Sequence, residues 1–284
     1  MMSGILSPAF LQAAGRAGKG APIGKIKLFT TAADPTINTI SCTGDIKVST
    51  IKNGEPLVQT YSDLSGDTLS IQADANTQII ISGAEITEFF LSNNFDIINI
   101  SAESDTLLML EFSTCTKLQS VDITRCLALE DFLCEYCPIQ SLDVTKNVAL
   151  KNLTITNNFN IQTLDITRNV ALENLDCQSL YNLQSLDVTK NVALISLYLT
   201  GCERLQSLDI SKNISMTELA TGGCTSIRTV YTLAKNQDVV NDIVDLINNN
   251  SALEGTVYVN DTDTYYSDIE TAAQNANWTI APLA

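Results

Sequence analysis

The sequence contains no histidine. This absence removes the commonest general base, the usual zinc ligand and every Ser–His or Cys–His dyad, so hydrolase chemistry would depend on carboxylates alone. Aromatic residues make up only 6% of the 284 residues, which predicts an aliphatic core. No run of residues is long and apolar enough to span a bilayer.

Positive charge is scarce and unevenly placed. The sequence has 16 basic and 32 acidic residues, which gives a net charge of −16. Because an acidic surface repels phosphate backbones, we expect no nucleic-acid partner. The residues before Asp34 carry +4, from Arg16, Lys19, Lys25 and Lys27, which leaves −20 for the remainder. This asymmetry predicts that residues 1–25 form an extended docking arm, held by a protein assembly partner or by another copy of the chain.

The start of the sequence does not resemble an export signal. No basic residue precedes the apolar run at residues 5–11, Pro8 interrupts that run, and no lipid-anchor cysteine follows. We therefore expect a protein that is assembled inside a cell.

A repeat dominates the middle of the chain. Its clearest copies read LQSVDITR, IQSLDVTK, IQTLDITR, LQSLDVTK and LQSLDISK, from Leu118, Ile139, Ile161, Leu183 and Leu205. Weaker copies of the same pattern lie between them and begin at Leu150, Leu172 and Leu194. Each half-unit follows LxxLxLxxN, so a half-period of about 11 residues is nested in a full period of about 22 residues.

The nested period predicts a mainly β fold. The two apolar residues of LxL point to the same side of a strand, into a core, and one full period is long enough for two short strands and two turns. We expect the strict copies to stack into one parallel sheet on what we call the A side, and the varied copies into a second on the B side. Weaker matches to the repeat upstream of Leu118 extend the predicted solenoid over residues 83–231, which gives six to seven coils.

Different patterns flank the solenoid. Residues 26–82 predict a small β-domain or N-terminal cap, with strands at 26–30, 39–42, 45–51, 68–71 and 78–82 and turns at 53–54, 65–67 and 74–76. Residues 232–284 predict an α/β cap, with helices over 236–249 and 265–275 and strands at 256–259 and 278–280. Such caps cover the apolar ends of a solenoid.

The repeat resembles the nested leucine-rich repeats of bacterial surface proteins of the Bacteroidetes type, which also occur in phages of such bacteria. The resemblance covers about half the chain, and the segment AAQNANWTI ending at Ile280 is similar to the end-caps of those proteins. It implies a leucine-rich-repeat solenoid that binds proteins or glycans, with catalysis rare. Surface members carry an export signal or lipid anchor, and this sequence shows neither.

Eight cysteines have a structural interpretation. Cys115, Cys126, Cys137, Cys202 and Cys224 stand where other repeat units have asparagine, as at Asn94, Asn147, Asn158, Asn169, Asn191 and Asn213. That side chain is expected to turn inward and bond to loop backbone, and a buried cysteine can replace it. Cys134 and Cys177 occupy inward LxL positions. The CxxC motif at residues 134–137 leaves zinc or redox chemistry as a weaker alternative, and we expect no metal or cofactor.

A row of aspartates marks the A side: Asp122, Asp143, Asp165, Asp187 and Asp209. Stacking would place them about 4.8 Å apart, so their charges repel. Five hydroxyls lie two residues later (Thr124, Thr145, Thr167, Thr189 and Ser211) and five cations three residues later (Arg125, Lys146, Arg168, Lys190 and Lys212). We interpret the rows as a ladder that compensates its own charge; cation binding and a glycosidase-like carboxylate pair remain alternatives.

The varied B side is the predicted recognition surface, although random drift would also explain its variation. Exposed aromatic and apolar groups favour a partner, and the amide content would also suit a glycan. The predicted partner-binding residues are Phe90, Leu133, Asn152, Thr154, Asn174, Asp176, Gln178, Ser196, Tyr198 and Thr200.

The sequence therefore predicts a structural or interaction protein and not an enzyme. We expect a phage virion component (a head-fibre, decoration or tail-associated subunit), present as a homo-oligomer or in many copies. Its arm would anchor it, and its solenoid would present a binding surface for a host protein or glycan. The alternatives are a bacterial cell-surface adhesin of the same repeat type and a carboxylate-based glycan hydrolase.

Overall fold

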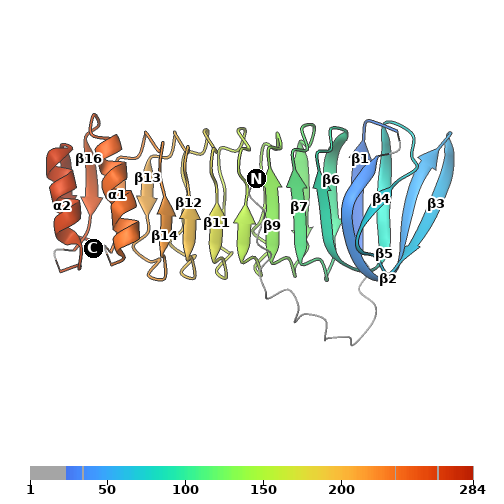
Figure 1. The fold of residues 1–284 in the computed structure, drawn as a ribbon, viewed down its shortest axis with the longest axis horizontal. Coiled ribbons are helices and arrows are strands. Elements are labelled where there is room, and N and C mark those ends of the chain that lie inside the picture. Colours follow the sequence, from blue (N-terminus) through green and yellow to red (C-terminus); the bar gives the residue numbers. More distant parts are fainter. Residues whose placement is uncertain (1–23, 34, 234, 261, 284) are drawn as a thin grey trace.

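The structure, a computed structural model, describes residues 24–33, 35–233, 235–260 and 262–283. It is an elongated, mainly β molecule with a β-hairpin at one end and two helices at the other (Figure 1). Within the described ranges, neither helix has the length and apolar content needed to cross a membrane.

Seven B-side strands lie next to one another in one sheet. They are β5 (Thr77–Ser92), β7 (Met109–Ser113), β9 (Asp131–Glu135), β10 (Asn152–Thr154), β11 (Asn174–Asp176), β12 (Ser196–Tyr198) and β14 (Glu218–Ala220). Each pairs with the next in parallel, and Leu153 lies opposite Leu175, which lies opposite Leu197. The register therefore advances by one full period of the repeat in each coil, as the sequence predicts.

The prediction of a continuous A-side sheet is wrong. Strands form only near its ends: β6 (Ile97–Glu103) and β8 (Ser120–Arg125) at one, β13 (Ser207–Asp209) and β15 (Thr229–Tyr231) at the other. Between them the described residues make a single isolated bridge, Thr163 to Ser185. The backbone bonds between coils are long on this side, 3.3 Å from Gln184 to Gln162, against 2.8 Å from Lys151 to Glu130 on the B side, so a full ladder does not form.

The N-terminal strands are longer than predicted and include one that the sequence analysis missed. They are β1 (Gly24–Thr30), β2 (Thr36–Lys52), β3 (Glu55–Ser62) and β4 (Ser65–Ser70). The two strands expected at 39–42 and 45–51 are one, β2, because Gly44 has a φ of 83° and the register shifts there without the chain turning back. The turn at Asn53 and Gly54 is confirmed, whereas the residues expected to turn at 65–67 begin β4.

Strand β5 joins the N-terminal strands to the solenoid. Its first half pairs with β1 and its second half with β7, so the boundary predicted between residues 82 and 83 falls inside a strand. Gly83 marks the change of partner: its φ is 131°, and a Cβ there would lie 2.4 Å from the carbonyl oxygen of Asp45. Only glycine permits this close approach of two backbones.

The predicted arm falls mostly outside the described residues, and Arg16 and Lys19 belong to that part. Lys25 and Lys27, also assigned to docking, lie in β1, which pairs antiparallel with β5 and β6. Both are half-buried, and they alternate with the buried Ile26 and Leu28. As a correction, these two lysines belong to a central strand and not to an extended arm.

The C-terminal cap follows the predicted elements closely. Helix α1 (Gln237–Asn249) begins after Asn236, whose side chain accepts the N–H groups of Asp238 and Val239, and it buries an apolar face. It is followed by β16 (Gly255–Tyr258), α2 (Tyr266–Asn275) and β17 (Trp278–Ala281). Strands β16 and β17 extend the sheet of β13 and β15, so the cap continues the A side in parallel pairing.

Two ladders of buried polar side chains tie consecutive coils together. Asn147, Asn169, Asn191 and Asn213 each donate two hydrogen bonds to carbonyls of the preceding coil, at 2.8–3.1 Å. On the opposite edge, the thiols of Cys115, Cys137, Cys202 and Cys224 point at carbonyls of the coil before. Asn94 differs from the prediction, because its side chain caps the turn at Asp96 and Ile97.

Candidate interaction surface

The two sides of the solenoid differ in how far their outward residues are enclosed. The central A-side aspartates are exposed. The outward residues at the middle of the B-side strands, called the central row here, are all half-buried: Phe90, Glu111, Leu133, Thr154, Asp176, Tyr198 and Ala220. Carboxylate acidity follows this difference. Hydrogen bonds from Thr167 lower the pKa of Asp165, and burial raises the pKa of Asp176. An ionised carboxylate is therefore less favourable at Asp176 on the B side than at Asp165 on the A side.

The A side partly matches its predicted ladder. Each aspartate accepts the hydroxyl and the N–H two residues later through Oδ1, with hydroxyl distances of 2.6–2.7 Å. Ion pairs with the cation row are not found: among the described residues, none of the five aspartates forms one with the cation three residues later. Arg125 instead pairs with Glu103 at 3.1 Å. Hydroxyl bonding, not ion pairing, is the contact these aspartates make.

A chain of side-chain hydrogen bonds crosses the B side. The Asn174 amide donates to Oδ1 of Asn152 at 2.7 Å, and the Asn152 amide donates to the carboxylate of Asp131. Three consecutive coils are thereby linked at one outward position. The bond from Asn152 lowers the pKa of Asp131, but burial outweighs it and the pKa is raised. The row is held rigidly, which suits a surface that presents fixed donors and acceptors.

Further along the B side, two carboxylates organise their neighbours. Asp176 accepts the backbone N–H and the side-chain amide of Gln178, each at 3.0 Å. The Tyr198 hydroxyl donates to Glu218, and this bond raises the pKa of Tyr198. Ser196 is buried and lies 3.4 Å from the same carboxylate, so it supports the surface from below.

The structure brings eight of the ten predicted B-side residues onto one continuous sheet, from Phe90 in β5 to Tyr198 in β12, whereas Gln178 and Thr200 lie in the turns that follow β11 and β12. Apart from the buried Ser196 and the exposed Thr200, they are half-buried. Their contact with a partner stays a prediction.

The predicted partner-binding residues do not include four acidic residues of this surface. Glu111 lies in the central row of outward residues, where the repeat places it, and Asp131, Glu135 and Glu218 flank that row. Burial, followed by the charge of Glu135, raises the pKa of Glu111. The signal was present in the repeat, because residues two apart on a strand share a face.

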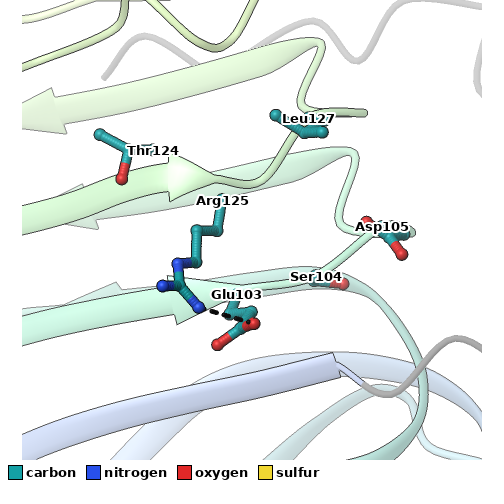
Figure 2. Close-up of a pocket in the computed structure, with 6 residues that line it drawn as sticks. All are labelled: Glu103, Ser104, Asp105, Thr124, Arg125 and Leu127. Carbon is teal, nitrogen blue, oxygen red and sulfur yellow. Dashed lines mark hydrogen bonds and ion pairs between the residues drawn. The ribbon is translucent and has the colours of Figure 1, made fainter.

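A shallow hollow of about 320 Å³ opens on the other side of the molecule, near the N-terminal end of the A side (Figure 2). Glu103, Ser104, Asp105, Thr124, Arg125 and Leu127 line it. The Arg125–Glu103 ion pair joins two neighbouring strands along it, so its charges are largely used within the molecule.

The CxxC cysteines lie in the core. Cys134 and Cys137 are buried, and all eight cysteines are unpaired thiols. Among the described residues, no three Cys, Asp or Glu side chains converge as ligands of a metal ion would. Burial raises the pKa of Cys126, Cys202 and Cys224 to about 12, so these thiols are protonated at neutral pH.

Comparison with known proteins gives distant structural likenesses only. No protein-family model and no curated protein sequence matches the chain. The functional domain of InlJ from Listeria monocytogenes, which includes a cysteine ladder, has a TM-score of 0.34 and 18% identity over 68% of this chain and 51% of its own. The internalin InlF of the same organism has a TM-score of 0.22 and 14% identity, over 69% of this chain and 82% of its own. The chain thus spans about half the length of the InlJ domain. Likenesses at these scores assign no family, and the description of the chain as a solenoid rests on its own stacked coils.

Proposed function

We propose that the protein is a non-enzymatic interaction module that binds a protein partner through its B side. The observation that carries this proposal is the contrast between the two sides of each coil. The A side repeats nearly the same residues, and its aspartates bond to their own turns. The B side changes from coil to coil while its central residues stay half-buried, and side-chain hydrogen bonds link its asparagines across coils.

The composition of the B side fits a contact surface for protein. Leu133 and Tyr198 offer apolar and aromatic area beside the amides of Asn152 and Asn174. Such a mixture of apolar area and fixed polar groups is typical of protein interfaces. The carboxylates of Glu111 and Asp176 are half-buried, and a basic group on the partner would stabilise their charged forms.

Site-specific photo-cross-linking tests this proposal in the cells or particles that contain the protein. A photoreactive phenylalanine is placed at position 154 in the middle of the B-side sheet, and a matched one at position 165 on the exposed A side. We expect discrete protein adducts from position 154 and none from position 165. Equal adducts at both positions, or none at 154, would contradict the B-side proposal.

We further propose that the module is part of a phage virion and that the basic N-terminal residues dock it there. The support is the charge of residues 1–23, which carry +2 from Arg16 and Lys19 and no acidic residue, against −18 for the remainder of the sequence. A bacterial cell-surface adhesin is the alternative. Deletion of residues 1–23 should abolish incorporation into purified particles, whereas surface exposure on uninfected bacteria would favour the adhesin.

A further inference from the structure

The turns that lead from the B side back to the A side carry a second hollow. It has a volume of about 430 Å³ and is lined by Gln140, Asn160, Gln162, Thr163 and Asn182. Every lining residue is uncharged and ends in an amide or a hydroxyl, on a molecule whose net charge is −16. The hollow spans three consecutive coils and is separate from the B-side sheet.

The lining amides are positioned by the solenoid itself. The Asn160 amide donates to the carbonyl of Pro138 at 3.3 Å, and the Asn182 amide donates to the carbonyl of Phe159 at 2.6 Å. Each bond reaches back one coil and fixes the asparagine while leaving its oxygen as an acceptor. Gln140 and Gln162 are exposed, and no side chain or backbone group among the described residues bonds to their amides. The hollow therefore offers donors and acceptors that the fold does not consume.

Aromatic rings occupy the same turns. Phe159 and Tyr181 directly precede the two asparagines, and their rings stack with centroids 5.2 Å apart and an interplanar angle of 10°. They remain 45% and 40% exposed, although large aromatic side chains are normally buried. Tyr136, one coil earlier, is 55% exposed. The stacked pair thus lies on the two turns that carry the asparagines of the hollow.

We propose that this edge binds a neutral oligosaccharide that lies along the solenoid axis. Sugar hydroxyls need both donors and acceptors, which side-chain amides supply together, and the C–H faces of a pyranose pack on aromatic carbon. Coils repeat about every 4.8 Å, close to the length of one sugar residue in an extended chain. Because the lining is uncharged, it offers no cation to pair with an acidic polysaccharide. The alternative ligand for the same hollow is an extended peptide.

Isothermal titration calorimetry of the full chain tests the proposal with three defined probes: cellohexaose, maltohexaose and β-1,4-mannohexaose. We expect at least one to bind, and the double variant Gln140→Ala/Gln162→Ala to weaken that binding at least about tenfold, because two hydrogen bonds are lost. Both glutamines are exposed and unbonded, so the variant should fold normally. The variant Phe159→Ala/Tyr181→Ala should weaken the same probe.

The repeat supplies a matched control. Gln119→Ala/Gln206→Ala removes the same exposed amide at the same repeat position in coils outside the hollow, and it should change the affinity less than twofold. Three results would overturn the proposal: no binding of any probe, equal binding by the Gln140→Ala/Gln162→Ala variant, or tighter binding of an uncharged alternating alanine–threonine hexapeptide than of every hexasaccharide. The B-side cross-linking is independent of each result.

Discussion

At the scale of single residues, the buried asparagine ladder explains why a cysteine can stand at position 126, the equivalent place one coil before Asn147. Asn147, Asn169, Asn191 and Asn213 use both N–H donors, but their Oδ1 atoms are buried without a hydrogen-bond partner. A thiol in the equivalent position gives up one donor and also removes this unbonded oxygen. The exchange is therefore less costly than loss of two amide bonds alone would suggest.

The ladder gives a direct stability prediction. Asn169→Ala should lower the free energy of unfolding by about 2–3 kcal/mol, because two buried bonds to the carbonyls of Val144 and Asn147 are lost and a cavity is left. Asn169→Cys should recover part of that loss. The exposed neighbour offers a control, since Val170→Ala should cost less than about 0.5 kcal/mol. Urea denaturation measures all three; equal values for the two alanine variants would refute the role of the ladder.

At the scale of elements, helix α1 contains a carboxylate in an unfavourable place. Burial, and then the charges of Asp245 and Asp238, raise the pKa of Asp242 to about 6. Its unfolded pKa is about 3.9, so the folded state binds a proton more readily, and the charged form destabilises the fold at neutral pH. The penalty shrinks as the pH falls through about 6 and vanishes only below the unfolded pKa of about 3.9.

Asp242→Asn should therefore stabilise the protein at pH 7, by an amount on the order of 1 kcal/mol after allowance for solvent screening. At pH 5 the gain should fall to about half of its value at pH 7, because the folded wild type is then mostly protonated while the unfolded chain is still ionised. Glu254→Gln, at an exposed carboxylate beyond the end of the helix, is the control. Urea denaturation at both pH values checks the prediction, and a gain that persists undiminished at pH 5 would contradict it.

The elements also show how far the sequence alone could lead. The LxL pattern placed the B-side strands, and the spacing of Val239, Val240 and Ile243 placed α1 within one residue. The prediction of an A-side sheet failed because period-2 alternation does not reveal how far apart the central coils lie on that side, where backbone bonds between them are 3.3–3.4 Å long. Strand β3 was missed because its inward side chains are only half-buried, which leaves little hydrophobic signal. Of the candidate surface, the central row and its flanking carboxylates both follow from the repeat, whereas the hydrogen bonds that join them across coils needed the register of the strands.

At the scale of the whole molecule, the coils form a nearly one-dimensional array in which each contacts its neighbours. Deletion of residues 161–182, one full coil, should join Asn160 to Leu183 in register and leave a folded, shorter solenoid. Deletion of residues 161–177 does not remove a whole number of half-units, so apolar side chains would face solvent and the protein should aggregate or unfold. Circular dichroism and gel filtration of both variants check this; equal behaviour would contradict the coil as the unit of assembly.

The near-identity of the A-side segments also has a genetic consequence. The DNA that encodes LQSLDVTK and its close copies recurs at regular intervals, and recombination pairs such stretches out of alignment. Because the copies lie one coil apart, each unequal exchange adds or removes a complete coil and preserves the reading frame. Natural variants should therefore differ in length by whole coils, and the varied B-side segments carried along would reshuffle the recognition surface with each exchange.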